Sequence, residues 1–481
     1  MSRLHSAVTF AFLDRYAGFA LGLAASMIIA RILTPADIGV WAVAGGFIAY
    51  LSTFRDLGAG QYLVQAGSLD PERIRAAWSM QLGMGLLIAL AVISASGPLA
   101  SFYGEPVLRD MLLIVAGGFA LNPFGSITYA VLMRELRFDR IAMIRFASAA
   151  AAASTSIYLA WRELGPISLA WGSLAGTAAT ALLGMILRPA GMPWMPGWRG
   201  IGGALTFGSS VTLNSITHTL ITCLPELLLG RLQGMTVTGL YSRANGLVTM
   251  YGRLFADALG PVAMAWFAEQ RRAGRALAEP FIKATACLCA PAWSLGIAVT
   301  LLAHPLLVVL FGAQWGGSAG LARLLAAGAM FSAAAAMTAP LMLACGASAI
   351  LRRASLASGA VAVILFAVGA PLGAPAMCIA VALCAAIGAI YWIHVTRELA
   401  GVTWLDFLGG LAPSLCVAAC AGIGPALAVL IFGIEPAAPV RALLVGTAGG
   451  VAGFVLAARL VSHPLYLEWQ QLRARTRGAP E

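Results

Sequence analysis

Residues 407–432 read FLGGLAPSLCVAACAGIGPALAVLIF, a stretch without a single charged side chain. A helix needs about 20 consecutive, mostly apolar residues to cross the ~30 Å hydrocarbon core of a bilayer, and this stretch exceeds that length. It therefore predicts a membrane-spanning helix, and comparable windows recur along the whole chain. They predict fourteen spans: about 8–30, 38–60, 78–97, 111–133, 141–161, 167–187, 203–229, 237–263, 282–303, 320–343, 355–373, 375–395, 407–432 and 441–461.

The composition of the 481-residue chain predicts the same class of protein. Hydrophobic residues make up 60% of the chain and charged residues 10%, against about 45–50% and about 25% in soluble domains. A soluble protein cannot bury that much apolar surface, because its core is limited by the surface-to-volume ratio. We therefore expect an all-α polytopic membrane protein, and disordered or disulfide-framework classes are excluded.

The net charge of +11 comes from short connections between the spans. Membrane proteins concentrate Arg and Lys in cytoplasmic connections, so these cations need no nucleic acid partner to explain them. If the N-terminus is cytoplasmic, twenty cations fall on the cytoplasmic side. Five fall on the opposite side, at Arg31, Arg109, Arg162, Arg231 and Arg441. This asymmetry predicts that both termini are cytoplasmic.

Metal-binding and catalytic patterns are missing from the sequence. The eight cysteines lie within or beside apolar segments and follow no metal or disulfide spacing, so we interpret them as packing residues. No phosphate-binding loop, zinc-protease pattern or nucleophile–base constellation can be assembled. We expect neither a metal site nor a catalytic residue. Small residues in the last span instead predict close helix packing, at Gly446, Gly449, Gly450 and Gly453.

The chain repeats itself at an offset of about 200 residues. Ala30–Leu33 ends the first span before Gly39, and Gly230–Gln233 ends the seventh span before Gly239. An even number of spans separates the copies, which predicts parallel repeats related by an axis along the membrane normal. The predicted organisation is an N-terminal six-helix lobe (1–190), a C-terminal six-helix lobe (200–396), two extra membrane helices (405–461) and a short basic cytoplasmic tail (462–481).

Several short motifs together resemble a known family. They are ARILTPADIG at 30–39, RDLGAG at 55–60, FYGEP at 102–106, RELRF at 134–138, LGR at 229–231, GLYS at 239–242 and LFG at 310–312. In combination, over roughly residues 1–345, they resemble the polysaccharide transporter branch of the multidrug/oligosaccharidyl-lipid/polysaccharide flippase superfamily, which contains Wzx-type O-antigen and exopolysaccharide flippases. One departure is Glu226, where related sequences often carry Asp.

The resemblance implies two six-helix bundles around a central cavity that opens alternately to either side of the membrane. It implies a flippase, not an enzyme, that moves undecaprenyl-diphosphate-linked oligosaccharides across the bacterial inner membrane for lipopolysaccharide or exopolysaccharide biosynthesis. The expected partners are the lipid-linked oligosaccharide, membrane lipids and polysaccharide polymerase machinery. No cofactor is expected, and coupling to H⁺ or Na⁺ stays open. Two alternatives remain: a small-molecule or drug cation antiporter of the same superfamily, and a membrane-embedded polysaccharide polymerase.

Ionisable side chains inside the spans are the candidate site residues, because each costs about 2.5–3.5 kcal/mol at the centre of a membrane helix. A diphosphate that enters a low-dielectric passage needs cationic partners with charge-assisted hydrogen bonds. The predicted cavity surface for the diphosphate comprises Arg15, Arg31, Arg55 and Arg243. Secondary cavity candidates are Asp14, Asp56, Arg145, Asn214, His218, Glu226, Arg253 and Asp257.

Several candidates have a structural alternative. Arg15, Arg55 and Arg145 could instead be anchors that reach toward the headgroups. Arg253 and Asp257 stand at i,i+4 spacing and could neutralise each other inside the bundle. Arg243 has no acidic neighbour at helical spacing, which favours an external anion as its partner.

Overall fold

The computed structural model describes the chain except residues 1, 57–58, 66–69, 194, 198–200, 252–256 and 478–481. For residues 2–16, 61, 64–65, 203–214, 251, 257–258, 472 and 474–477 it describes only the backbone. Within the described residues the regular structure is helical throughout, so the predicted all-α class is confirmed. Contacts between residues group the chain into two compact units, Met1–Gly239 and Leu240–Glu481.

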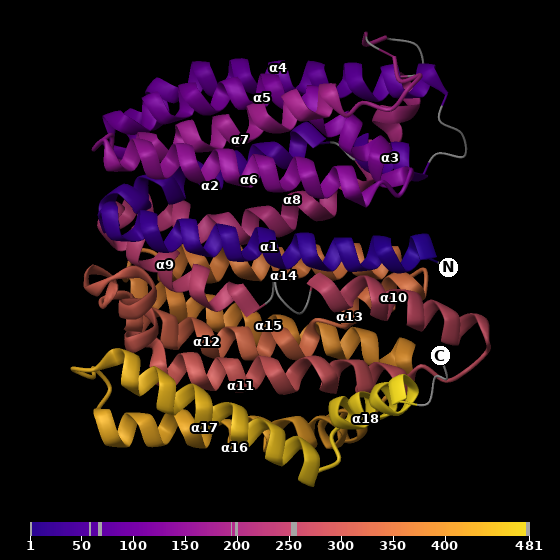
Figure 1. Ribbon diagram of the computed structural model, residues 1–481, viewed down its shortest axis with the longest axis vertical. Coiled ribbons are helices and arrows are strands. Elements are labelled where there is room, and N and C mark those ends of the chain that lie inside the picture. Colours follow the sequence, from indigo (N-terminus) through magenta and orange to yellow (C-terminus); the bar gives the residue numbers. More distant parts are fainter. Residues whose placement is uncertain are drawn as a thin grey trace. The chain divides into compact units, whose positions relative to one another are not determined.

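Eleven helices in the described residues are long and apolar enough to span a membrane (Figure 1). They coincide with eleven predicted spans. The first, seventh and eighth predicted spans fall on helices that are only partly described, so the total of fourteen stays a prediction. The eleven are α2 (Pro35–Asp56), α4 (Pro71–Tyr103), α5 (Pro106–Arg134), α6 (Phe138–Trp161), α7 (Ile167–Ile186), α11 (Ala278–Phe311), α12 (Ser318–Ala335) continued by α13 (Thr338–Ala344), α14 (Ser348–Gly369), α15 (Ala374–Ala400), α16 (Trp404–Phe432) and α17 (Pro439–Leu460).

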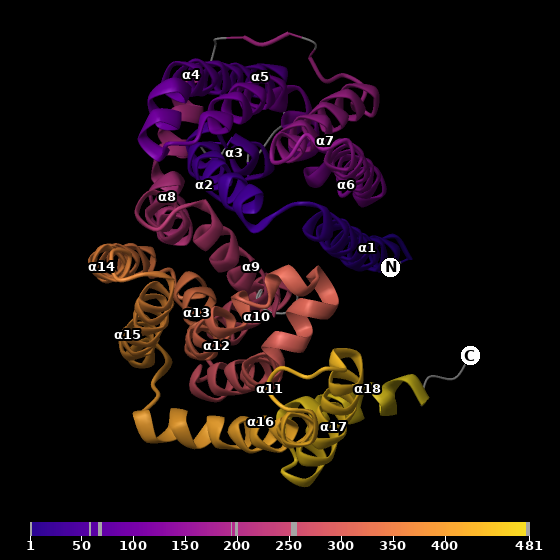
Figure 2. The ribbon, with the colours of Figure 1, turned by 90° about the vertical axis from the view of Figure 1, so that its left-hand side faces the viewer.

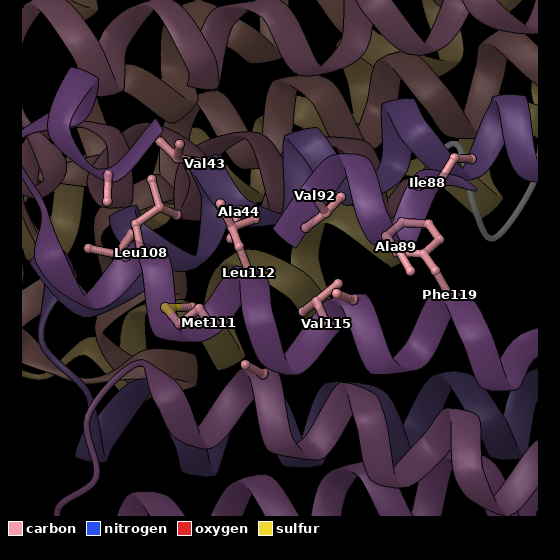
Figure 3. Packing of buried hydrophobic residues seen from close by; sticks show 14 of the residues in the cluster. Val43, Ala44, Ile88, Ala89, Val92, Leu108, Met111, Leu112, Val115 and Phe119 are labelled. Atoms are coloured by element: carbon pink, nitrogen blue, oxygen red, sulfur yellow. The ribbon is translucent and has the colours of Figure 1, made fainter. Parts of the chain in front are cut away.

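The first unit also contains α1 (Ser2–Ile32), α3 (Ala59–Gln65) and α8 (Ile201–Leu232). Its central core lies where α2, α4 and α5 meet (Figure 3). α5 buries residues three or four positions apart, which is the spacing that places them on one face of a helix. These core residues are Val43 and Ala44 of α2, Ile88, Ala89 and Val92 of α4, and Leu108, Met111, Leu112, Val115 and Phe119 of α5.

The second unit holds most of α9 (Met235–Tyr251), then α10 (Asp257–Arg272), the short 3₁₀ helix η2 (Ala313–Trp315) and α18 (Pro464–Arg477). α11 packs against α16, which lies beside α17 (Figure 2). Stacked rings of Phe281 and Phe407, with centroids 5.8 Å apart, join α11 to α16. A Cβ at Gly449 of α17 would lie 2.8 Å from the Cα of Gly424 in α16, so the predicted small-residue packing is confirmed.

The second predicted span, over 38–60, falls on α2 and the start of α3, and residues 57–58 lie outside the described part of the chain. α8 belongs by its contacts to the first compact unit, because it packs against α2 and α4. The predicted six-helix lobes are defined by the internal repeat rather than by contacts, and they stay a prediction.

The segment after Ser462, predicted as a basic tail, forms helix α18. Its start is held by His463, which is fully buried. The Nδ1 atom of His463 accepts a hydrogen bond from the backbone N–H of Leu465 at 3.2 Å. Nε2 must then carry the proton, so it donates to the Ser414 hydroxyl at 2.9 Å, which in turn donates to the carbonyl of Ala286. An ion pair between Lys283 and Glu468 (2.6 Å) ties α18 to α11.

This arrangement makes the docking of α18 sensitive to acid. Burial lowers the pKa of the His463 imidazole from its usual 6.5, because the charged form loses hydration. The unfolded chain then binds a proton that the folded chain resists, so stability is full above about pH 6.5 and falls as the pH drops below it. We expect thermal unfolding at a lower temperature at pH 5.5 than at pH 7.5.

The matched variant is His463→Gln, which cannot titrate. It should lower stability at pH 7.5 by about 1–3 kcal/mol, because it disrupts a buried hydrogen-bonded chain, and it should lose most of the pH dependence. An unchanged pH dependence in this variant would mean that other groups control the transition.

Candidate functional site

The short connection between α1 and α2 forms the N-terminal cap of α2. The hydroxyl and the backbone N–H of Thr34 both donate to Oδ2 of Asp37, at 2.7 and 2.9 Å, and the N–H of Asp37 donates back to the Thr34 hydroxyl at 3.2 Å. This reciprocal pattern satisfies the N–H groups that a helix start leaves without partners. Pro35 follows as the first helical residue, where its missing N–H is no loss. The sequence TPAD therefore fixes where α2 begins.

One turn later, two glycines make a reciprocal contact. A Cβ at Gly39 of α2 would overlap the carbonyl of Met235, the first residue of α9. A Cβ at Gly239 of α9 would overlap the carbonyl of Pro35, the first residue of α2. Each glycine thus holds its Cα–H against the other helix start, a close approach of the kind that recurs at tight helix crossings. Only glycine allows this approach.

The contact repeats the offset found in the sequence. Pro35 and Gly39 correspond to Met235 and Gly239 at an offset of 200 residues, and exchanging the two copies reproduces the same contact. A two-fold relation between the copies produces this self-complementary pattern. We call the contact of these four residues the glycine crossing. It joins the second predicted span to the eighth.

A polar stripe runs along one side of α8, within the seventh predicted span. Ser215, His218 and Thr222 are exposed and Glu226 is partly exposed, at spacings of three or four residues that place them on one face. The stripe covers about 16 Å at 1.5 Å per residue, roughly half of the ~30 Å hydrocarbon thickness. Polar side chains at such depth face water-filled space or other protein rather than lipid.

Neighbouring helices hold α8 in place. The hydroxyl of Thr53 in α2 donates to that of Thr219 in α8 at 3.2 Å. Tyr103, at the end of α4, donates its hydroxyl to the carbonyl of Leu227 at 3.2 Å. The guanidinium of Arg231 lies 4.9 Å from the ring centroid of Phe102. These contacts fix the stripe relative to α2 and α4.

Arg55, one of the four predicted diphosphate ligands, lies at the end of α2 beside its own neighbour. Its guanidinium binds the carboxylate of Asp56 with two contacts of 2.8 Å. It also lies 5.7 Å from the ring centroid of Phe119. Its side chain is 14% exposed and that of Asp56 is 54% exposed. The carboxylate of this pair is therefore more exposed than the guanidinium.

Arg243 lies in the second unit against two aromatic rings. Its guanidinium is 4.5 Å from the ring centroid of Phe311 and 4.7 Å from that of Trp315. Both rings are buried. A cation over the face of an aromatic ring gains about 0.5–2 kcal/mol, so the two rings position this guanidinium. Its aromatic partners come from α11 and η2, some 70 residues along the chain, which the sequence did not indicate.

The remaining predicted residues are spread over several helices. Arg31 is exposed in the last turn of α1, where a cation interacts favourably with the negative end of the helix dipole. Arg145 is exposed on α6 beside exposed Met143 and Phe146, as expected for either an anchor or a cavity residue. For Asp14, Arg15, Asn214 and Asp257 only the backbone is described, and Arg253 lies outside the described residues.

Within the first unit the structure brings some candidates together. His218 and Glu226 share the stripe on α8, and Arg55 and Asp56 form one pair. In the second unit, the guanidinium of Arg243 contacts the rings of Phe311 and Trp315. The sequence did not assign Ser215 and Thr222 to the site, although their spacing from His218 was a visible signal. Within the described residues no group of three or more His, Cys, Asp or Glu side chains could hold a metal.

Comparison with known proteins identifies the family. A family model described as "Polysaccharide biosynthesis protein" matches residues 28–319. The chain is 25% identical to the lipopolysaccharide biosynthesis protein WzxC of Escherichia coli (strain K12) over 244 residues, which is 48% of this chain and 47% of that protein. It is 24% identical to the succinoglycan biosynthesis transport protein ExoT of Rhizobium meliloti (strain 1021) over 310 residues, 63% of this chain and 61% of that protein. The chain thus matches about half to three fifths of the length of these relatives.

Solved structures extend the likeness to the fold. The lipid II flippase MurJ, in an inward closed conformation, aligns with a TM-score of 0.73 at 13% identity, covering 94% of this chain and 98% of that one. An inward-facing multidrug resistance MATE family transporter of the MOP superfamily aligns with a TM-score of 0.58 at 14% identity, covering 81% and 98%. At these identities the likeness concerns the fold alone. The chain is a multi-pass membrane protein of the polysaccharide biosynthesis protein family, with the fold of MurJ and the MATE transporters.

Proposed function

We propose that this protein is a flippase that moves undecaprenyl-diphosphate-linked oligosaccharides across the bacterial inner membrane by alternating access. The observation that carries the proposal is the polar stripe of α8 in a member of a polysaccharide biosynthesis family. An oligosaccharide is rich in hydroxyl groups, and each loses hydration when it leaves water. Side chains such as His218 and Thr222 can replace those hydrogen bonds inside the membrane.

In this proposal the glycine crossing is the contact that forms in one transport state and breaks in the other. Interfaces between packed helices tend to have discrete arrangements rather than continuous ones. A contact that depends on two backbone-to-backbone approaches is made or broken as a whole. We assign it to the outer end of the passage, because it joins the ends of the spans that the charge asymmetry places outside.

The fold alone does not choose between substrates, since it is shared with a multidrug transporter. The match to the polysaccharide biosynthesis family over residues 28–319 favours the lipid-linked saccharide over a small-molecule antiporter. His218 and Glu226 are the titratable members of the stripe, and we propose them as the residues through which H⁺ or Na⁺ would couple to transport. The four arginines Arg15, Arg31, Arg55 and Arg243 stay proposed diphosphate ligands.

Deleting the gene tests the proposal. A strain without the flippase should accumulate complete repeat units on lipid in the cytoplasmic leaflet, measured by labelling the saccharide and by its access to added glycosidase in inverted vesicles. A strain without a polymerase would leave single units at the periplasmic face. Loss of an antiporter would change neither pool, and that result would contradict the proposed function.

Thr222→Val tests the stripe itself. The change removes a hydroxyl but keeps the volume, so the protein should fold while glycan export falls by up to about tenfold, the equivalent of one hydrogen bond of about 0.5–1.5 kcal/mol. Thr447→Val on α17 is the matched control, because both hydroxyls are exposed and donate to a carbonyl of their own helix. Equal export by the two variants would show that the polar stripe of α8 does not line the passage.

A further inference from the structure

A cavity of about 250 Å³ lies between α14 and α15 in the second unit. Ala357 and Val361 of α14 line one wall, and Ile387, Gly388 and Tyr391 of α15 line the other. Gly388 opens the space, because a Cβ built there would meet no atom within 4 Å. Ile387 is 45% exposed and Tyr391 37% exposed, so the cavity is a groove that opens to the surroundings. We call it the α14–α15 groove.

The lining of this groove is apolar. Its one hydroxyl from α14, that of Ser358, accepts a hydrogen bond from the indole N–H of Trp392 at 2.9 Å and so is occupied within the wall. Both helices are long and apolar enough to span the membrane. The large apolar side chains Leu383, Ile387 and Ile390 of α15 are exposed, and we infer from them that this side of the helix pair, with its groove, faces hydrocarbon. Water would find few polar partners there. A hydrocarbon chain is the occupant that the lining fits.

The groove is short compared with the membrane. Its wall on α15 runs from Cys384 to Tyr391, about 10 Å at 1.5 Å per residue. Half of the hydrocarbon core is about 15 Å thick. The groove therefore matches a stretch of an acyl chain that stays in one leaflet.

Two arginines mark one end of the groove. Arg353 precedes Ala357 by four residues and Val361 by eight, so it continues the same helix face toward the start of α14. Arg352 stands beside it, and both are exposed. The end of α15 at this side also carries Glu398, which leaves the two arginines with a net positive charge. By the positive-inside rule, this end faces the cytoplasm.

We propose that the α14–α15 groove binds one acyl chain of an anionic glycerophospholipid of the cytoplasmic leaflet, with its phosphate held by Arg353 and Arg352. The apolar groove receives the chain, and the guanidinium groups offer the charge-assisted hydrogen bonds that phosphate accepts in a fork geometry. The headgroup then lies one to two helical turns beyond the groove. This assignment does not depend on the flippase proposal, because it uses neither the stripe nor the glycine crossing.

Native mass spectrometry of the purified full chain tests the groove. Protein released from detergent containing phosphatidylglycerol should retain one molecule of that lipid. Gly388→Leu places a side chain in the groove at a position where a Cβ meets no atom within 4 Å, and should reduce retention at least fivefold. Gly409→Leu on α16 is the matched control, since its Cβ also meets nothing within 4 Å and the residue is exposed. Equal retention by both variants would overturn the site.

The arginines are tested in the same measurement. Arg353→Gln should lower phosphatidylglycerol retention at least fivefold, whereas Arg459→Gln, an exposed arginine in the last turn of α17, should leave it unchanged. Wild-type protein should prefer phosphatidylglycerol to phosphatidylethanolamine, and equal retention of the two would overturn the charge assignment. If wild-type protein retained undecaprenyl phosphate in place of phosphatidylglycerol when both were present, and Gly388→Leu retained neither, the groove would belong to the substrate and the phospholipid assignment would be wrong.

Discussion

Gly39→Leu is expected to reduce glycan export at least tenfold while the protein still reaches the membrane. A side chain at this position collides with the backbone of Met235, which cannot rotate out of the way as a flexible side chain could. Overpacking of this kind typically costs about 1–3 kcal/mol. If the glycine crossing exists in only one of two transport states, that cost shifts the equilibrium by about 5–150-fold toward the other. Export needs both states, so it falls.

The same helix provides the control. Gly45 stands six residues further along α2, and a Cβ there meets no atom within 4 Å. Gly45→Leu should therefore export normally. Gly239→Leu should reproduce the effect of Gly39→Leu, because the contact is reciprocal, and Gly39→Ala should already show part of it. Export at the wild-type rate by Gly39→Leu, at a normal protein level, would refute the role of the crossing.

A second measurement separates a shifted equilibrium from misfolding. Thr238 is fully buried beside the crossing. Thr238→Cys should resist a membrane-impermeant maleimide added from outside in the otherwise wild-type chain, and should react when combined with Gly39→Leu. A misfolded protein would instead be lost from the membrane. Native cysteines set the background, which the chain without Thr238→Cys measures.

Long-period features of the fold followed from the sequence, whereas its close contacts did not. The apolar windows located the spans because burying twenty residues in hydrocarbon is a property of the local sequence alone. The glycine crossing involves residues 200 positions apart, and nothing local in either copy says which backbone its glycine will meet. The repeat pointed to both glycines as equivalent, but equivalence does not predict contact.

The site was predicted in part for the same reason. His218 and Glu226 stand out as polar residues inside an apolar run. The free-energy cost of placing each such side chain in the membrane was enough to single them out as candidates. The sequence did not indicate that the side chain of Arg55 would bind that of its neighbour Asp56, and its assignment as a diphosphate ligand stays a prediction. The sequence did not predict helix α18, because the segment has too few apolar residues to indicate burial. The start of this helix also depends on the hydrogen bond between His463 and Ser414, a residue of another helix.

Arg243 is expected to serve both the fold and the substrate, and variants of it separate the two roles. Truncation in Arg243→Ala leaves space between the rings of Phe311 and Trp315, and large-to-small changes of this size cost about 2–5 kcal/mol. The amount of folded protein should therefore fall sharply in this variant, and glycan export should fall with it. This variant alone cannot distinguish a structural residue from a ligand.

Arg243→Met keeps most of the volume between the rings and removes only the charge. We expect it to fold while export per folded molecule drops at least tenfold, because stacking uses the faces of a guanidinium and a phosphate is bound in its plane. Arg243→Lys keeps the charge without the planar fork and should fall between Met and wild type. Export is measured against the amount of detergent-stable protein, so stability and transport are read separately.

Arg397 is the matched control for a stacked arginine. It lies in the last turn of α15, two residues beyond the predicted span over 375–395. Its guanidinium is 5.9 Å from the ring centroid of Trp404, the first residue of α16. Arg397→Met removes the same charge and a comparable ring contact, so it should cost some stability and no export per folded molecule. Should Arg243→Met behave in the same way as Arg397→Met, the two rings around Arg243 would account for its burial, and the diphosphate would have to be bound by the arginines of the first two spans.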